Sequence, residues 1–214
     1  MKVIVATNNR GKLEELRALL PDGLDLLTLS DAGLDSPEES GTTFEENALI
    51  KARAAAPHAD AAFADDSGLV VDALDGRPGV WSSRFAGPAA TDADNNARLL
   101  AELSDVSDDD RTARFVSVVA LVTSDGHEFI ATGCVEGRIG RQERGAGGFG
   151  YDPLMIVADP NAVEFIGLTM AELSVEQKNL ISHRARAYRE LLSVLREAGF
   201  SFGMADDSSG VTEG

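Results

Sequence analysis

The 214-residue sequence is poor in cysteine, in aromatic residues and in long hydrophobic runs. Its only cysteine, Cys134, cannot form an internal disulfide, and no charged start followed by a long apolar run acts as a secretory signal. The apolar run 115–122 is short and interrupted, whereas a membrane span needs roughly 20 apolar residues. We therefore expect a cytoplasmic protein that does not enter a membrane.

Cationic residues are also scarce, since the chain has 19 Lys and Arg residues but 36 Asp and Glu residues, which gives a net charge of -17. A surface of this sign repels the phosphates of DNA and RNA, so no nucleic acid is expected as a partner. A small phosphorylated ligand would require cations that gather locally, or a metal ion that offsets the field.

The residues that are present indicate an α/β domain. Hydrophobic residues make up 43% of the chain and charged residues 26%, which fits a globular protein. Hydrophobic spacing and capping signals predict alternating strands and helices around a central sheet. The expected elements are a strand at 2–6, a helix after residue 12, a helix at 43–57, a strand at 61–64, a helix from 91, strands at 112–123 and 128–139, a strand at 154–157 and a helical region at 174–198. The polar segment 201–214 has little to bury.

The first loop, Thr7 to Lys12, joins the first strand to a helix. Its backbone amides and the positive end of the helix dipole would face an anion there, and Lys12 adds a full charge. The pattern is not the P-loop motif. The alternatives are a phosphate site and an ordinary polar turn.

Lys51 interrupts an apolar stripe on the second expected helix. A buried ammonium group is costly unless it is paired, so Lys51 meets either an internal carboxylate or a substrate phosphate. The alternative is a lysine whose stem packs while its head reaches water.

Two adjacent carboxylates, Asp65 and Asp66, follow the strand at 61–64 and precede Ser67 and Gly68. Ligands commonly bind at strand ends in α/β sheets, and the repulsion between neighbouring carboxylates is relieved by a divalent cation such as Mg²⁺. A second acidic pair, at 38 and 39, precedes the second helix. The alternative is a solvated turn.

The segment 145–153 combines a glycine-rich backbone with two aromatic rings and one carboxylate, a composition suited to closing over a flat base. Its rings could instead anchor the loop in the core. Further along, Lys178, His183 and Arg184 lie in the last helical region but not on one stripe, so a break at Ser182 would help them to converge.

These motifs together resemble the inosine triphosphate pyrophosphatase family, which acts on non-standard purine nucleoside triphosphates. The matching segments are ATNNRGK at 6–12, TFEENA at 43–48 with Lys51 and Ala52, ADDSGL at 64–69, PGVWSSR at 78–84, GGFGYDP at 147–153 and SHR at 182–184. Each is common alone, but six in this order make coincidence remote.

The resemblance implies a two-lobed α/β fold with a long mixed sheet flanked by helices, an active-site cleft between the lobes, and a homodimer. It implies Asp66 as general base and Mg²⁺ ligand, with Glu38 favoured over Glu39 as the second acidic ligand. The implied substrate-binding residues are Thr7, Asn8, Asn9, Arg10, Gly11, Lys12, Lys51, Ser67, Phe149, Gly150, Tyr151, Asp152, Lys178, His183 and Arg184, with Phe149 as the stacking ring.

The implied reaction converts ITP, dITP or XTP into the nucleoside monophosphate and pyrophosphate, so that these bases are not incorporated into DNA or RNA. One catalytic domain would span residues 1–198, and 199–214 would form an acidic tail. Two alternatives remain: a Maf-like pyrophosphatase with another base preference, and a nucleotide sensor that does not catalyse.

Overall fold

The computed structural model describes residues 1–7, 13, 16–17, 20 and 23–202, and the described chain is built on a six-stranded mixed sheet. The strands are β1 Lys2–Val5, β2 Asp25–Thr28, β3 Ala61–Val71, β4 Thr112–Thr123, β5 Glu128–Ile139 and β6 Met155–Val157. They lie in the order β2-β1-β3-β4-β5-β6. β1 is parallel to both neighbours, and the pairs from β3 to β6 are antiparallel.

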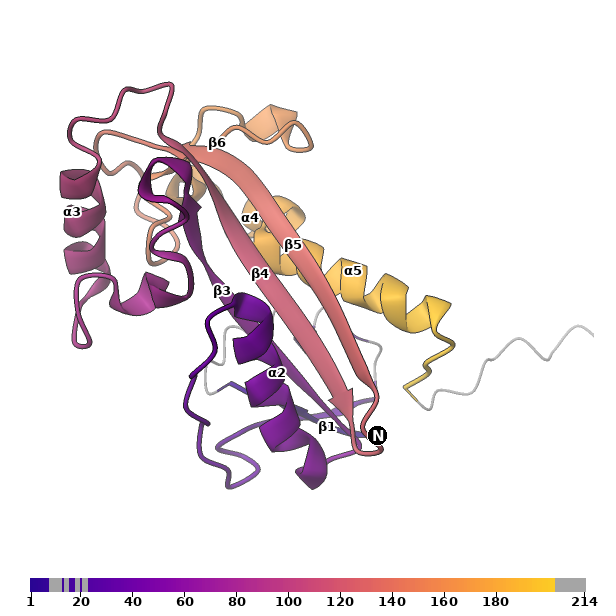
Figure 1. The fold of residues 1–214 in the computed structure, drawn as a ribbon. Helices are drawn as coiled ribbons and strands as arrows, with labels where there is room; N and C mark the ends of the chain where they lie inside the picture. Colours follow the sequence, from indigo (N-terminus) through magenta and orange to yellow (C-terminus); the bar gives the residue numbers. More distant parts are fainter. Residues whose placement is uncertain (8–12, 14–15, 18–19, 21–22, 203–214) are drawn as a thin grey trace, which may run out of the picture.

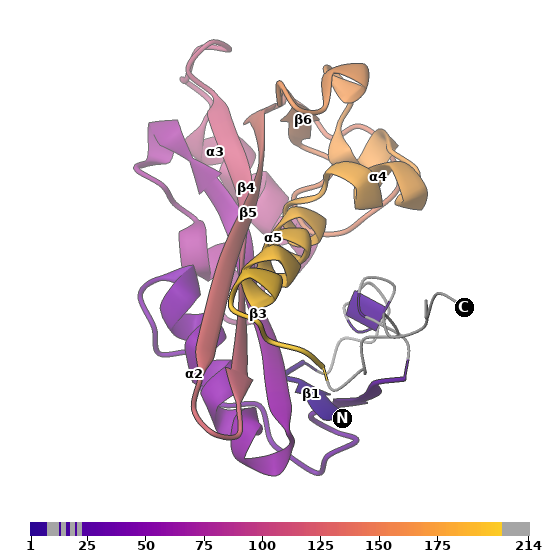
Figure 2. The same cartoon turned by 90° about the vertical axis from the view of Figure 1, so that its right-hand side faces the viewer.

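Helices cover both faces of the long strands (Figures 1 and 2). The α-helices are α2 Phe44–Ala55, α3 Asp92–Glu102, α4 Val175–Ile181 and α5 His183–Glu197. Short 3-10 helices occupy Ala56–His58 (η1), Asp72–Leu74 (η2), Gly79–Arg84 (η3), Val163–Phe165 (η4) and Met170–Glu172 (η5). The α2 face is lined by alanines that let the helix approach the sheet closely, whereas α5 buries Tyr188, Leu191 and Leu195 on the other face.

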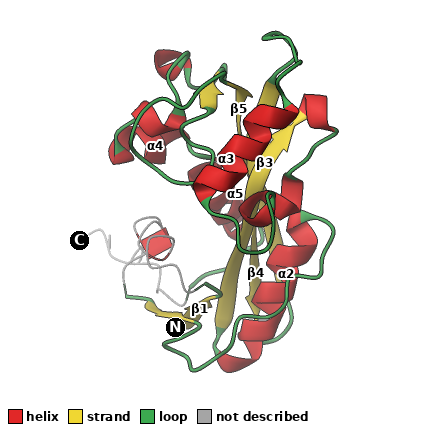
Figure 3. Ribbon diagram, turned by 90° about the vertical axis from the view of Figure 1, so that its left-hand side faces the viewer, coloured by secondary structure: helices red, strands yellow, loops and turns green. Residues whose placement is uncertain are grey.

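One lobe contains β1, β2 and α2. A second lobe is built around the opposite end of the long strands, where α3, α4 and β6 lie (Figures 2 and 3). Its core joins Leu69 and Phe115 of the sheet to Leu99 of α3, Met155 of β6 and Ile181 of α4. The long strands β3, β4 and β5 run through both lobes. The predicted two-lobed α/β fold with a central mixed sheet is therefore confirmed.

Most predicted elements are confirmed with small changes in their bounds. Thr43 and Glu46 cap α2 reciprocally, and Thr91 with Asp94 does the same for α3. The hairpin strands β4 and β5 have the predicted bounds. The predicted break at Ser182 is also present, since it ends α4 and accepts a hydrogen bond from Ala185 N as the cap of α5. The helix expected after residue 12 lies largely outside the described residues.

The prediction for β3 was wrong in its length. We expected a strand at 61–64 that ended in polar residues, but antiparallel pairing with β4 continues to Val71 opposite Ala113. The polar residues from Asp65 to Ser67 therefore lie within the strand. Pairing with a long neighbour satisfies their backbone groups, which local sequence signals do not reveal.

The packed chain extends beyond residue 198, where the catalytic domain was expected to end. Phe200 contacts the ring of Phe129 at 5.6 Å, and Phe202 stacks on Phe63 at 6.2 Å, measured between ring centroids. Both rings join the core on the α5 face. Among the described residues, no helix is long and apolar enough to cross a bilayer.

Candidate active site

The polar stretch of β3 lies along an open edge of the sheet. Among the described strands, β1 pairs with β3 only as far as Phe63, and a bridge to Pro78 follows at Val70. Between these points the β3 edge from Asp65 to Gly68 has no neighbouring strand in the described chain, and at Leu69 the backbone N–H donates to Ser82 Oγ of η3. Thr7 follows the end of β1 beside this gap, while predicted site residues 8–12 lie outside the described residues. We call the stretch from Asp65 to Gly68 the open edge of β3, because no described strand pairs with it on the side away from β4.

Asp66 points towards α2, where it meets two side chains of that helix. Asn47 Nδ2 donates to one carboxylate oxygen at 3.0 Å, and Lys51 Nζ lies 3.6 Å from the other. Ser67 N also donates to Asp66 at 3.0 Å. Burial raises the pKa of Asp66 above its ordinary value, and Lys51 and Asn47 oppose that rise. A carboxylate of raised pKa is suited to accept a proton.

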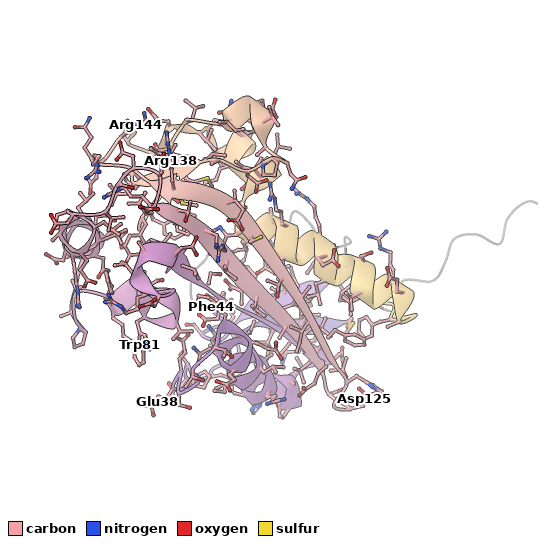
Figure 4. All side chains as sticks on the ribbon, turned by 45° about the horizontal axis from the view of Figure 1, so that its top comes forward. Glu38, Phe44, Trp81, Asp125, Arg138 and Arg144 are labelled. Atoms are coloured by element: carbon pink, nitrogen blue, oxygen red, sulfur yellow. The ribbon has the colours of Figure 1, made fainter. Side chains whose placement is uncertain are left out.

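Lys51 is buried and joins two carboxylates, because its Nζ also lies 2.8 Å from Glu39 Oε1. The resemblance favoured Glu38 as the second acidic residue, but Glu38 is exposed and points outward (Figure 4). Glu39 instead contacts the lysine that contacts Asp66. Of the two acidic residues, Glu39 is the one that shares the cation Lys51 with Asp66.

Asp65 and Asp66 lie on opposite faces of the sheet, because successive side chains of a strand alternate. Arg184 Nε lies 3.3 Å from Asp65 Oδ2, which also accepts from Ser67 Oγ at 3.2 Å. Ser67 Oγ also lies 2.9 Å from Ser117 Oγ, from which it can accept a hydrogen bond. The two adjacent carboxylates thus do not face each other, and each has its own cationic side chain as a partner.

The glycine-rich loop forms one wall of a pocket beside this edge. Phe149 is 58% exposed, whereas Tyr151 is buried and its hydroxyl donates to Ser82 O at 2.8 Å. Burial raises the pKa of the Tyr151 hydroxyl, so it remains a proton donor. Of the two rings, only Phe149 is free to stack on a ligand, and Tyr151 anchors the loop as the alternative interpretation proposed.

Asp152 holds the loop in shape. It is buried, forms an ion pair with Lys178 and accepts from Phe149 N at 2.9 Å. Gly148 has a φ of +74°, and a Cβ there would collide with the Asp152 carboxylate. Lys178 Nζ also lies 4.8 Å from the centre of the Phe149 ring. The ring and the ammonium group thus occupy one corner of the pocket.

The start of α5 closes the pocket from the sheet side. His183 stacks on Phe115 with ring centroids 5.1 Å apart, and Arg184 reaches Asp65. A Cβ on Gly133 of β5 would strike the backbone of this helix, so glycine is required for the close approach. The pocket is lined by Ser67, Gly68, Leu69, Ser82, Ser83, Asp92, Asn95, Phe115, Phe149, Gly150, Tyr151, Asp152, His183 and Arg184.

Two tethers that the sequence did not predict position the pocket. Gly150 N donates to Asp92 Oδ2 at 2.7 Å, and Gly150 O accepts from Asn96 Nδ2 at 3.1 Å, so α3 holds the loop at both backbone groups. No local signal marks these residues, since helix caps and solvated helix faces use the same types. Asn47 could have been found, because it lies one turn before Lys51 on the same helix face.

The fold defines a two-lobed α/β protein whose long central strands run through both lobes and carry the candidate site residues Asp65, Asp66 and Ser67. The model of the Ham1 family matches residues 3–194, and the chain belongs to that family.

Individual relatives are similar to this chain in sequence over nearly their whole lengths. A dITP/XTP pyrophosphatase of Corynebacterium diphtheriae is 48% identical, with 94% of this chain and 99% of that protein covered. The protein of the same name from Escherichia coli is 47% identical over 91% of this chain and 98% of its own length. Among solved structures, a HAM1 protein from Coxiella burnetii has a TM-score of 0.83 at 41% identity, covering 92% of this chain and 99% of that one. The Staphylococcus aureus Ham1 protein has a TM-score of 0.82 at 38% identity, with 92% and 100% covered.

Proposed function

We propose that this chain hydrolyses the non-standard purine nucleoside triphosphates ITP, dITP and XTP to the nucleoside monophosphate and pyrophosphate, which removes them from the nucleotide pool. The observation that carries the proposal is the Asp66–Lys51 pair at the open edge of β3, beside a pocket that ends in the exposed Phe149 ring. The relatives named dITP/XTP pyrophosphatase support the same activity.

In this proposal, Asp66 accepts the proton of a water that attacks the α-phosphorus. Its raised pKa makes the carboxylate a stronger base than an exposed aspartate, and the hydrogen bonds from Asn47 and Ser67 fix its orientation. Lys51 would bind phosphate oxygens from its position beside Asp66. The segment 7–12 would also hold the phosphates.

The residues present fit a magnesium ion. No group of three acidic, His or Cys side chains converges within the described residues, so this part of the chain would supply only Asp66 and Glu39. Magnesium is commonly bound by one or two carboxylates together with waters and substrate phosphates. When bound, Mg²⁺ would neutralise phosphate oxygens and orient the triphosphate.

The base would stack on Phe149, with Lys178, Asp152, His183 and Arg184 around it. Hypoxanthine and xanthine present a carbonyl at position six and a protonated ring nitrogen beside it, whereas adenine presents the opposite pattern. When the polar groups of a pocket match hypoxanthine and xanthine, the same groups remain without hydrogen-bond partners when adenine is bound. The reaction with ATP is therefore slower. As the resemblance implies, we further propose that the enzyme works as a homodimer.

Product analysis with ITP and Mg²⁺ tests this function. Release of pyrophosphate rather than orthophosphate identifies the α–β bond as the one that breaks. A panel of ITP, XTP, dTTP and UTP separates the proposal from a Maf-like enzyme, because ITP hydrolysed no faster than dTTP or UTP would contradict it. Binding of ITP without any turnover would instead indicate a nucleotide sensor.

A further inference from the structure

A surface groove lies beside the reaction centre on the α2 side of the sheet. It is lined by Glu38, Glu39, Ser40, Gly41, Thr42, Trp81 and Arg84. Figure 4 shows the side chains of Trp81 and Glu38 at the periphery of the molecule. Trp81 is 56% exposed, which is unusual for the chain's only tryptophan in a protein with few aromatic residues. Neither Trp81 nor Arg84 has a role in the proposed reaction so far.

Four charges of alternating sign connect Asp66 to this groove. Lys51 Nζ lies 3.6 Å from Asp66 and 2.8 Å from Glu39, and the far oxygen of Glu39 lies 4.0 Å from Arg84 Nη1. Side-chain exposure rises along the row, from 8% and 12% for Lys51 and Asp66 to 31% for Glu39 and Arg84. The row therefore leads from the buried reaction centre to solvent and ends in a cation.

Arg84 is held in place without being fully neutralised. Its guanidinium lies over the Trp81 ring, 4.5 Å from the centroid, and its distance to Glu39 is at the outer limit of an ion pair. The short helix η3 that carries both residues is fastened to β3, because Ser82 Oγ accepts from Leu69 N at 2.9 Å and donates to Gly79 O at 2.6 Å. Arg84 thus has a fixed position relative to Asp66 and open donor groups.

We infer that Arg84 binds the pyrophosphate portion of the substrate and of the product, an inference that rests on the proposed function. Hydrolysis attaches the water oxygen to the α-phosphorus and breaks its bond to the bridging oxygen, whose electron pair leaves with pyrophosphate. The charge of that group rises as the bond breaks. A guanidinium group presents paired donors that match phosphate oxygens, and it stabilises this charge at the solvent end of the row.

The position of Trp81 provides a direct assay on the full-length protein. Pyrophosphate bound to Arg84 draws the guanidinium away from the indole ring, so titration with Mg²⁺ and pyrophosphate is expected to change the tryptophan fluorescence to saturation. In Arg84→Gln, the dissociation constant rises at least tenfold or the signal is lost. Arg84→Lys, which keeps the charge but not the paired donors, binds with intermediate strength. Equal concentrations of sodium chloride produce no saturable change.

Arg53→Gln is the matched control, because it removes the same charge from an exposed arginine of α2 that pairs with Glu128, outside the site. If Arg84 acted only through the overall charge, both variants would weaken binding equally. In steady-state assays, the KM for ITP and the inhibition constant of pyrophosphate rise about tenfold in Arg84→Gln and stay within twofold of wild type in Arg53→Gln.

Two results overturn the inference. One is a folded Arg84→Gln protein whose pyrophosphate inhibition and KM match those of wild type. The other, which applies even if Arg84→Gln does not fold, is an Arg84→Lys variant with unchanged pyrophosphate affinity. Both results can occur while the wild-type protein releases pyrophosphate from ITP normally. If the proposed function fails, the wild-type protein itself does not hydrolyse ITP, so the two kinds of failure can be distinguished.

Discussion

Replacing Asp66 by asparagine tests the proposed chemistry directly, because it removes one charge and one basic oxygen while keeping the size of the side chain. The general base is lost, and so is the carboxylate that faces Lys51 at 3.6 Å. A positioned general base contributes about 10²- to 10⁴-fold to the rate. We therefore expect kcat to fall by about that factor, which corresponds to about 3–5 kcal/mol in the activation barrier.

The variant should nevertheless fold. Asparagine can still accept the bond from Ser67 N, but its amide group would face the Asn47 amide, so one hydrogen bond to a charged group, worth about 1.5–3 kcal/mol, is lost. The removal of a buried charge offsets part of this loss. Because burial raises the pKa of Asp66, its contribution to wild-type stability is full below 3.8 and declines as the pH rises through the folded-state pKa. Relative to wild type, the variant therefore gains stability as the pH rises.

The assay is pyrophosphate release from ITP at saturating Mg²⁺, with thermal unfolding measured on the same samples across pH. Asp125→Asn is the control, since this exposed carboxylate lies in the turn at the far end of the β4–β5 hairpin (Figure 4). Wild-type kcat/KM should fall as the pH drops through the raised pKa of Asp66. A folded Asp66→Asn protein with kcat within tenfold of wild type would refute the role assigned to Asp66.

Three further substitutions test the pocket and the fold. Phe149→Ala should raise the KM for ITP, because base stacking on a ring is worth about 1–3 kcal/mol; an unchanged KM would remove the ring from binding. Gly148→Ala should also raise the KM for ITP, because the nearest atoms that its Cβ meets belong to Asp152 of the same loop. The melting temperature should stay close to wild type, and an unchanged KM would contradict this. Arg111→Met should lower the free energy of unfolding in urea by about 3 kcal/mol or more, since the buried guanidinium donates to three backbone carbonyls at the ends of α3 and β5. A loss below about 1 kcal/mol would show that water replaces these donors.

The sequence predicted those features that depend on neighbouring residues. The α2 cap needs only Thr43 and Glu46, three residues apart, and the break between α4 and α5 needs only Ser182 as a cap. The β4–β5 hairpin follows from two apolar runs joined by a turn with glycine at 126. Each of these signals involves residues only a few positions apart, so the sequence alone is enough to predict these elements.

Features that depend on distant pairing could not be read in this way. The length of β3 is set by β4, which begins about fifty positions later, and this pairing places Asp65 and Asp66 on opposite faces. The choice between Glu38 and Glu39 depends on which carboxylate a loop turns towards Lys51. The anchoring of Gly150 by α3 joins segments 58 positions apart. Composition and spacing contain none of this information.

The charges at the site explain how so acidic a chain can hold an anionic substrate. Four carboxylates near the cleft have cationic partners: Asp66 and Glu39 pair with Lys51, Asp65 with Arg184, and Asp152 with Lys178. The net charge of -17 therefore resides mostly on other surfaces, where it repels polyanions at long range. Salt screens exposed charges over about 8–10 Å, whereas buried pairs are screened much less. Binding of a triphosphate thus depends on which local ion pairs it can replace. The buried Lys51 already has a carboxylate on either side. A phosphate can bind to it only when the charges of these carboxylates are neutralised by another cation.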